Sequence, residues 1–145
     1  MKLRLERSSE YTETEIDIRC STIDEKLQKI IDIAQNDEKH ITVKKDGFSS
    51  RIRAEDIYYF ESVEEKSFVY CKDEVYSSEL KLYELEELFN NTSFVRISKS
   101  CILNTDVLDR VKISLNGKME ATLQNNEKVI INRHYVPAFK KKLGL

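Results

Sequence analysis

The sequence is short of glycine and of long apolar runs, and each shortage excludes a class of protein. Only three glycines, Gly47, Gly117 and Gly144, occur in 145 residues, so no glycine-rich loop is present to cradle a phosphate. No apolar run approaches the roughly 20 residues that cross a bilayer, and residues 1–6 lack the apolar core of a signal peptide. We therefore expect a cytoplasmic protein without a small-molecule substrate.

Metal ligands and catalytic groups are also sparse. The two histidines, His40 and His134, have no second ligand candidate at metal spacing. Cys20, Cys71 and Cys101 are far apart and form no C-x-x-C pair, so we expect reduced thiols, with redox sensing as the lesser alternative. No G-x-S-x-G elbow accompanies the serines. We expect no metal, no cofactor and no enzymatic activity.

Charge is distributed unevenly along the chain. The whole sequence has a formal net charge of -2, yet residues 94–145 contain ten Lys/Arg and four Asp/Glu, a net of +6. Residues 1–93 contain fourteen and twenty-two, a net of -8. A basic face on an acidic body attracts phosphate through its local field. Taken without other features, two differently solvated surfaces remain the alternative.

Residues 1–38 predict two strands and a helix. Runs of alternating apolar and polar residues over 2–6 and 15–20 predict half-buried strands, joined through residues 8–13 as a hairpin. A helix follows, with Thr22 and Glu25 as its capping box and an end near Asn36. Its apolar stripe is Ile23, Leu27, Ile30, Ile31 and Ala34. Such a ββα extension has too little core to fold alone, so we expect it to serve packing or dimerisation.

From residue 39 the pattern predicts a mainly β domain with short helices. Asp46-Gly47 is a strong two-residue hairpin turn, and Asn116-Gly117, between residues 107–115 and 118–123, is the best hairpin signal in the sequence. A two-turn helix is predicted over residues 82–89, and Pro137 suits the first turn of a final helix.

The motif residues with apolar side chains are expected in the core. They are Tyr58, Phe60, Phe68, Leu85, Leu88, Phe94, Ile102, Val129 and Ile131. A stacking surface for single-stranded nucleic acid, built from Tyr58, Tyr59 and Tyr70, is the alternative that we weigh against it. Basic residues do not interleave with these tyrosines, which favours the core.

Residues 94–104 fit neither regular period. Phe94, Ile102 and Leu103 flank a polar, basic centre that neither a buried strand nor an amphipathic helix favours. We expect an exposed loop held at both ends by the core.

Four segments, in order along the chain, resemble the motifs of one known family. Residues 94–104, F-V-R-I-S-K-S-C-I-L-N, resemble the signature F-x-R-x-H-R-S-x-x-(I/V)-N. Residues 56–62 resemble a "DI-Y-ES" strand, residues 82–88 a short helix, and residues 132–135 a terminal "S-R-R-Y" element. These motifs belong to the LytTR family of bacterial transcription regulators. The resemblance implies a LytTR-type all-β DNA-binding domain over residues 39–145, after the N-terminal ββα extension of residues 1–38.

The resemblance also implies which residues contact DNA. The family inserts side chains from three places into successive major grooves: the loop after the "ES" strand, the central loop, and the end of the last strand. By position these become Lys66 and Ser67, then Ser98 and Lys99, then Arg133. Because Ser98-Lys99 replaces the family's usual His-Arg, base preference does not carry over.

Two further signature residues have two interpretations each. Arg96 is a DNA-binding candidate as a phosphate contact, or it anchors the central loop through an ion pair or hydrogen bond. Asn104 closes that loop, where an Asn commonly bonds backbone groups. For Lys66, Ser98, Lys99 and Arg133, a merely solvated surface position is the alternative to a DNA contact.

The function implied is site-specific binding of double-stranded DNA and regulation of transcription, as a homodimer on repeated half-sites. The alternative is a protein-interaction module with weak or lost DNA binding. Free-standing members of the family are often controlled by a membrane-protein antagonist, so such a partner is compatible with both interpretations. Promoter, direction of regulation and input signal are not encoded in any motif of the sequence.

Overall fold

The computed structural model describes residues 1–35 and 39–145. The chain divides into two compact units, Met1–Asp37 and Glu38–Leu145, and each is described by itself. The expected helix end near Asn36 and the expected domain boundary after residue 38 fall on residues 36–38, outside the described part. Within the described part, no helix is long and apolar enough to cross a membrane.

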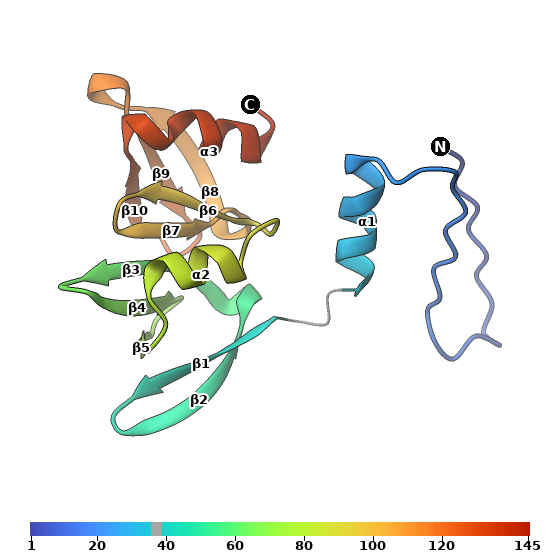
Figure 1. The fold of residues 1–145 in the computed structure, drawn as a ribbon, viewed down its shortest axis with the longest axis horizontal. Coiled ribbons are helices and arrows are strands. Elements are labelled where there is room, and N and C mark those ends of the chain that lie inside the picture. Colours follow the sequence, from blue (N-terminus) through green and yellow to red (C-terminus); the bar gives the residue numbers. More distant parts are fainter. Residues whose placement is uncertain (36–38) are drawn as a thin grey trace. The chain divides into compact units, whose positions relative to one another are not determined.

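The first unit contains one helix, α1 (Glu25–Gln35), as expected from its apolar stripe (Figure 1). The cap differs from the expectation. Asp24 Oδ1 accepts a hydrogen bond from the backbone N of Leu27 at 2.7 Å, so Asp24 satisfies a donor of the first turn in place of Thr22.

The prediction of two strands in the first unit is wrong. Residues 1–20 form no strand, and the side chain of Leu3 is 92% exposed. The chain does turn where a hairpin connection was expected, with Tyr11 N donating to Ser8 O at 3.3 Å. Alternation of apolar and polar residues produces a strand only where a partner strand and an apolar surface are available, and residues 1–20 have neither.

The second unit is mainly β, as predicted (Figure 1). A seven-stranded antiparallel sheet has the order β2-β1-β5-β4-β3-β7-β6, and a three-stranded antiparallel sheet has the order β10-β9-β8. The strands are β1 (His40–Lys45), β2 (Phe48–Arg53), β3 (Ile57–Val63), β4 (Lys66–Cys71), β5 (Val75–Ser78), β6 (Phe94–Ser98), β7 (Cys101–Asn104), β8 (Leu108–Ile113), β9 (Met119–Leu123) and β10 (Lys128–Ile131). The helices are α2 (Leu82–Leu88) and α3 (Val136–Leu143), with 3-10 turns η1 (Ala54–Asp56), η2 (Thr105–Val107), η3 (Leu115–Gly117) and η4 (Arg133–Tyr135).

Both predicted hairpins are confirmed, although the β8–β9 loop is longer than two residues: it contains η3 and is closed by a hydrogen bond from Ser114 N to Lys118 O at 2.8 Å. Asp46 and Gly47 join β1 to β2 with φ of 52° and 79°, and Asn116 and Gly117 lie between β8 and β9 with φ of 59° and 75°. Asn, Asp and Gly tolerate positive φ, which two-residue hairpin loops require. Pro137 lies in the first turn of α3, where its missing N–H leaves no intrahelical bond unmade.

The seven-stranded sheet separates two apolar cores. One core packs Val43, Ile57 and Phe60 against α2, while the other packs β6 and β7 against the three-stranded sheet and α3. A β-bulge in β3 between Ile57 and Tyr59 places both Tyr58 and Tyr59 in the second core. Tyr59 and Tyr70 stack with ring centroids 4.3 Å apart. The tyrosines therefore belong to the core rather than to a surface for single strands.

Six of the nine expected core residues are buried, Phe68 and Val129 are half-buried, and Leu88 is exposed; Phe68 belongs to neither apolar core. Leu88 is 43% exposed, whereas its neighbour Phe89 is fully buried and packs against Phe60 and Phe94. Phe89 follows the buried Leu82 and Leu85 by seven and four residues, and its N still donates to Leu85 O at 3.0 Å, so helical spacing places Phe89 on the buried face in place of Leu88.

Residues 94–104 are a hairpin rather than an extended loop. Strands β6 and β7 pair from Phe94↔Asn104 to Ser98↔Cys101, and only Lys99 and Ser100 form the turn. The polar, basic centre is therefore confined to a tight turn, and the polar residues preceding it lie in a paired strand.

Candidate nucleic-acid interface

The structure brings three segments that are distant in sequence to one edge of the second unit. The turn between β3 and β4 is linked to the turn between β6 and β7, because Ser62 N donates to Ser100 O at 2.8 Å. The end of β10 is linked to β6, because Asn132 N donates to Ile97 O at 2.9 Å. Both hairpin turns lie on the left side of the domain in Figure 1. The three predicted places are thus held together by backbone hydrogen bonds.

The first place is a two-residue turn. Glu64 and Glu65 connect β3 to β4 with φ of 50° and 66°, and Lys81 Nζ donates to Glu65 O at 3.3 Å. Lys66, the next residue, is exposed and offers a positive charge at the tip. Ser67 is only 2% exposed, because it lies in β4 between Ser62 of β3 and Ser78 of β5. Its side chain is therefore not presented at the surface.

The second place is the turn of the β6–β7 hairpin. Lys99 is exposed, and Ser98 is half-buried. Ser98 Oγ accepts a hydrogen bond from Ser100 N at 3.2 Å and lies 3.4 Å from Ser100 Oγ. These contacts between Ser98 and Ser100 stabilise the turn, and Lys99 is its exposed charged residue.

Arg96 braces this turn from behind. Its Nε donates to Ser98 O at 2.7 Å, its Nη2 donates to Lys99 O, and its Nη1 donates to Glu86 Oε2 at 2.7 Å. The side chain is 24% exposed. Since the guanidinium is directed at the turn's own carbonyls and at α2, this geometry fits the anchoring interpretation better than the phosphate contact.

Asn104 ties the other end of the hairpin to the sheet. It is buried, its Nδ2 donates to Ile57 O at 2.8 Å, and its Oδ1 accepts from Asp106 N at 3.0 Å and from Ser93 Oγ at 2.7 Å. A buried side chain with protein partners on both its donor and its acceptor has a structural role here.

The third place is the residue that follows β10 by two positions. Arg133 is exposed in η4, directly after the backbone link from Asn132 to β6. Gly117 of the β8–β9 turn lies against its aliphatic stem, and a Cβ at Gly117 would stand 2.7 Å from Arg133 Cδ. The absence of a side chain at Gly117 therefore makes room for Arg133.

Three residues that support the segments predicted to contact DNA were not predicted from the sequence. They are Lys81, Glu86 and Gly117. Glu86 was interpreted as part of the polar side of a short helix and Gly117 as a turn residue only, and no prediction was made for Lys81. Each acts through a contact with a residue distant along the chain, for which no local sequence signal exists.

The thiols of Cys71 and Cys101 are half-buried and have raised pKa values. Burial, together with the nearby Glu61, raises the pKa of Cys101 to about 12, and burial raises the pKa of Cys71 to about 11. Reactivity of a thiol requires the thiolate, which is scarce at neutral pH when the pKa is this high. Among the described residues, no group of three or more His, Cys, Asp or Glu side chains is placed to hold a metal.

Comparison with known proteins identifies relatives over the whole chain. The sequence profile of the LytTr DNA-binding domain matches residues 49–144. A protein of Staphylococcus aureus, named as an uncharacterized HTH-type transcriptional regulator, is 27% identical over 150 residues, which span 100% of this chain and 99% of that protein. The sensory transduction protein LytT of Enterococcus faecalis is 31% identical over 94 residues, 65% of this chain and 39% of that protein.

A solved structure has the same fold. The LytTr DNA-binding domain of a Bacillus cereus protein superposes with a TM-score of 0.70 at 22% sequence identity. The match covers 74% of this chain and 99% of that one.

Proposed function

The chain belongs to the LytTR family of DNA-binding domains, and from this membership we propose that it regulates transcription by binding specific sites in double-stranded DNA. The observation that carries the proposal is that three segments meet at one edge of the second unit. They are the β3–β4 turn, the β6–β7 turn and the segment after β10, and we call them the three tips. Lys66, Lys99 and Arg133 are exposed there, on segments linked by the Ser62–Ser100 and Ile97–Asn132 hydrogen bonds. Rigid strands hold these cations in fixed relative positions, which suits insertion into the grooves of a duplex.

The residues take different roles in this proposal. Arg133 and Lys99 contact base edges, since a guanidinium or ammonium group matches guanine O6 and N7. Lys66 neutralises a phosphate, and Ser98 makes a weaker, less discriminating contact. Arg96 positions the turn, and Ser67 is left out because it is buried in the sheet.

We further propose a homodimer on repeated half-sites in the cytoplasm, with residues 39–145 as the DNA-binding domain. Residues 1–38 supply the dimer contact, because the apolar side chains of Ile23 and Ile33 are 58% and 75% exposed in the first unit. The family is one of DNA-binding domains rather than of enzymes, and we propose no catalytic activity or cofactor.

A second candidate function is an interaction module that binds a partner, such as a membrane-bound antagonist, through residues 1–38. The net charge of -8 over residues 1–93 and the exposed Leu3, Leu5 and Ile16 favour it. A pull-down with the full chain and with a chain lacking residues 1–38 separates the two functions. Capture by the full chain only, without specific DNA binding, supports the interaction module.

The test of DNA binding is a fluorescence-anisotropy titration with the DNA upstream of the protein's own gene and with a scrambled duplex. We expect tighter binding to the upstream DNA and a steep loss of affinity as salt rises. The double variant Lys99→Ala with Arg133→Ala should lose preference for the upstream DNA, since each good base contact contributes about 1–3 kcal/mol of discrimination. Unchanged preference and salt dependence in this variant would contradict the site assignment.

A further inference from the structure

The outer face of the three-stranded sheet carries a group of basic side chains that are not part of the three tips. Strand pairing places residues of β8, β9 and β10 in two rows across this face. The first row is Arg110, Thr122 and Lys128, and the second is Lys112, Glu120 and Ile130. The alternate residues, including Ala121, face the core. We call these two rows the outer face.

The outer face has an excess of positive charge. Lys112 Nζ lies 3.1 Å from Glu120 Oε2, so one cation of the face is offset by its one carboxylate. The nearest acid to Arg110 is its own neighbour Asp109, at 3.9 Å, and both side chains are more than half exposed. Within residues 1–35 and 39–145, Lys128 has no ion-pair partner, and it is exposed. Two largely uncompensated cations therefore flank Thr122 in one row, and Thr122 itself is buried between them.

This arrangement suits a phosphate group. A guanidinium and an ammonium are side-chain groups that commonly donate to phosphate oxygens. The residues of the first row, with Lys112 and Glu120, line one shallow hollow in the surface. Paired strands are about 4.8 Å apart, so Arg110 and Lys128 stand roughly 10 Å apart with Thr122 between them.

The outer face is continuous with the edge that carries Lys66, Lys99 and Arg133, which we call the reading edge. Gly117, at the turn of the β8–β9 hairpin, lies against the stem of Arg133. Arg110 precedes Gly117 by seven residues, and Lys128 precedes Arg133 by five residues. At about 3.3 Å per residue, both cations lie within roughly 23 Å of the reading edge along the chain. That distance equals about seven base pairs of duplex, at 3.4 Å per phosphate along each strand.

We propose that the outer face binds phosphodiester groups of the DNA that flanks the base pair contacted by Arg133. The proposal rests on the proposed function, because it extends the same interface. Arg110 and Lys128 are phosphate contacts in it, and Glu120 limits the strength of the contact by repelling phosphate. The outer face contributes affinity and salt dependence but no base discrimination.

The first test compares the salt dependence of three charge-removing variants on both the upstream and the scrambled duplex. Arg110→Ala and Lys128→Ala should each make the slope of log affinity against log salt shallower by about 0.9, the value for one phosphate contact. Arg51→Ala is the control, since Arg51 is also exposed but lies on β2, an edge strand of the seven-stranded sheet rather than of the three-stranded sheet. An unchanged slope in the first two variants, or an equal change in all three, would overturn the proposal.

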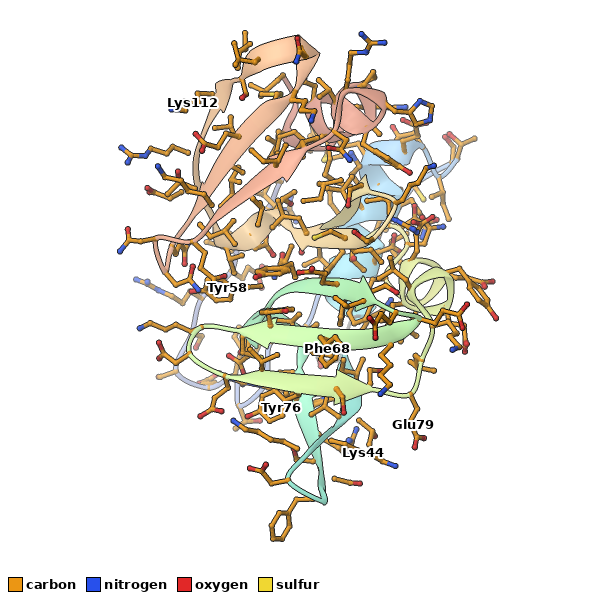
Figure 2. All side chains as sticks on the ribbon, turned by 90° about the vertical axis from the view of Figure 1, so that its left-hand side faces the viewer. Lys44, Tyr58, Phe68, Tyr76, Glu79 and Lys112 are labelled. Carbon is orange, nitrogen blue, oxygen red and sulfur yellow. The ribbon has the colours of Figure 1, made fainter. Side chains whose placement is uncertain are left out.

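The second test removes a negative charge and expects the opposite sign. Glu120→Gln should strengthen binding to both duplexes and steepen the salt dependence. Glu79→Gln is its control, because Glu79 also pairs with a lysine, Lys44 of β1, at the other end of the domain. Figure 2 shows Lys112 by the three-stranded sheet and the Lys44 and Glu79 side chains at the far end of the view. Weaker binding by Glu120→Gln, or equal strengthening by both variants, would count against the outer face.

The two sets of measurements separate this inference from the proposed function. If the wild-type protein prefers the upstream DNA but the slopes do not respond to Arg110 or Lys128, only the outer face is wrong. If the protein shows no preference but the slopes respond as expected, the outer face stands and site-specific reading fails. Thermal unfolding of each variant checks that the exposed substitutions leave the fold intact.

Discussion

Arg96 and Glu86 form an ion pair that joins the β6–β7 hairpin to α2, with Arg96 Nη1 2.7 Å from Glu86 Oε2. The remaining guanidinium donors go to the carbonyls of Ser98 and Lys99. One side chain thus fixes the turn on which a proposed base contact stands. Because Lys81, at the start of the same helix, donates to Glu65 O, α2 braces two of the three tips.

Substitution of Arg96 by alanine should reduce specificity without changing salt dependence. Loss of its three hydrogen bonds destabilises the hairpin by about 1.5–3 kcal/mol, the usual effect for bonds with a charged partner. The preference for upstream over scrambled DNA should fall, because Lys99 loses its fixed position. A phosphate contact would instead make the salt slope shallower by about 0.9. Anisotropy titrations at several salt concentrations distinguish these outcomes.

Glu86→Gln should produce a milder version of the same effect, since Arg96 keeps its two carbonyl partners. Glu87→Gln is the control on the same helix, because Glu87 is exposed. If both substitutions change DNA preference equally, the effect comes from the charge of α2 rather than from the ion pair.

Gly117→Ala should weaken DNA binding more than Gly47→Ala. Both glycines have positive φ, 75° and 79°, so both substitutions strain a hairpin turn by a similar amount, about 1 kcal/mol. Only at Gly117 does the added methyl group meet another side chain, 2.7 Å from Arg133 Cδ, whereas nothing lies within 4 Å at Gly47. Thermal unfolding measures the shared strain, and DNA titration measures the displacement of Arg133. Equal DNA affinity in the two variants would contradict the role given to Gly117.

Lys66→Ala and Ser67→Ala should behave differently although the residues are adjacent. Lys66 is exposed at the β3–β4 turn, so its loss should make the salt slope shallower by about 0.9. Ser67 is buried in β4, so its substitution should leave the slope unchanged and affect unfolding only. A larger DNA-binding defect for Ser67→Ala, in a protein of unchanged stability, would return Ser67 to the interface.

Alkylation should discriminate among the three cysteines by pH. Since the folded-state pKa values of Cys71 and Cys101 are raised to about 11 and 12, their thiolate fractions stay low at pH 8 and increase only as pH approaches those values. Iodoacetamide at pH 8 should therefore modify the exposed Cys20 first, as judged by peptide mass spectrometry. Rapid modification of Cys101 in the folded protein would show that the hairpin opens.

Local patterns in the sequence predicted the elements whose cause is local. The turns at Asp46-Gly47 and Asn116-Gly117, and Pro137 at the start of α3, follow from backbone preferences of single residues, and all are where they were expected. The same reasoning failed for residues 2–6 and 15–20, because alternation needs a partner sheet that those residues lack. It also predicted a loop over residues 94–104, where pairing of β6 with β7 instead forms a hairpin.

By itself, the sequence determined the β-rich class of the domain, its turns, its family motifs and its uneven charge. Only the tertiary structure decided which candidate residues are available at the surface. It buried Ser67, turned Arg96 onto its own hairpin, and brought Lys66, Lys99 and Arg133 to one edge. The physical reason is that strand register and the packing of two sheets depend on contacts between residues far apart in the chain, which no local pattern records.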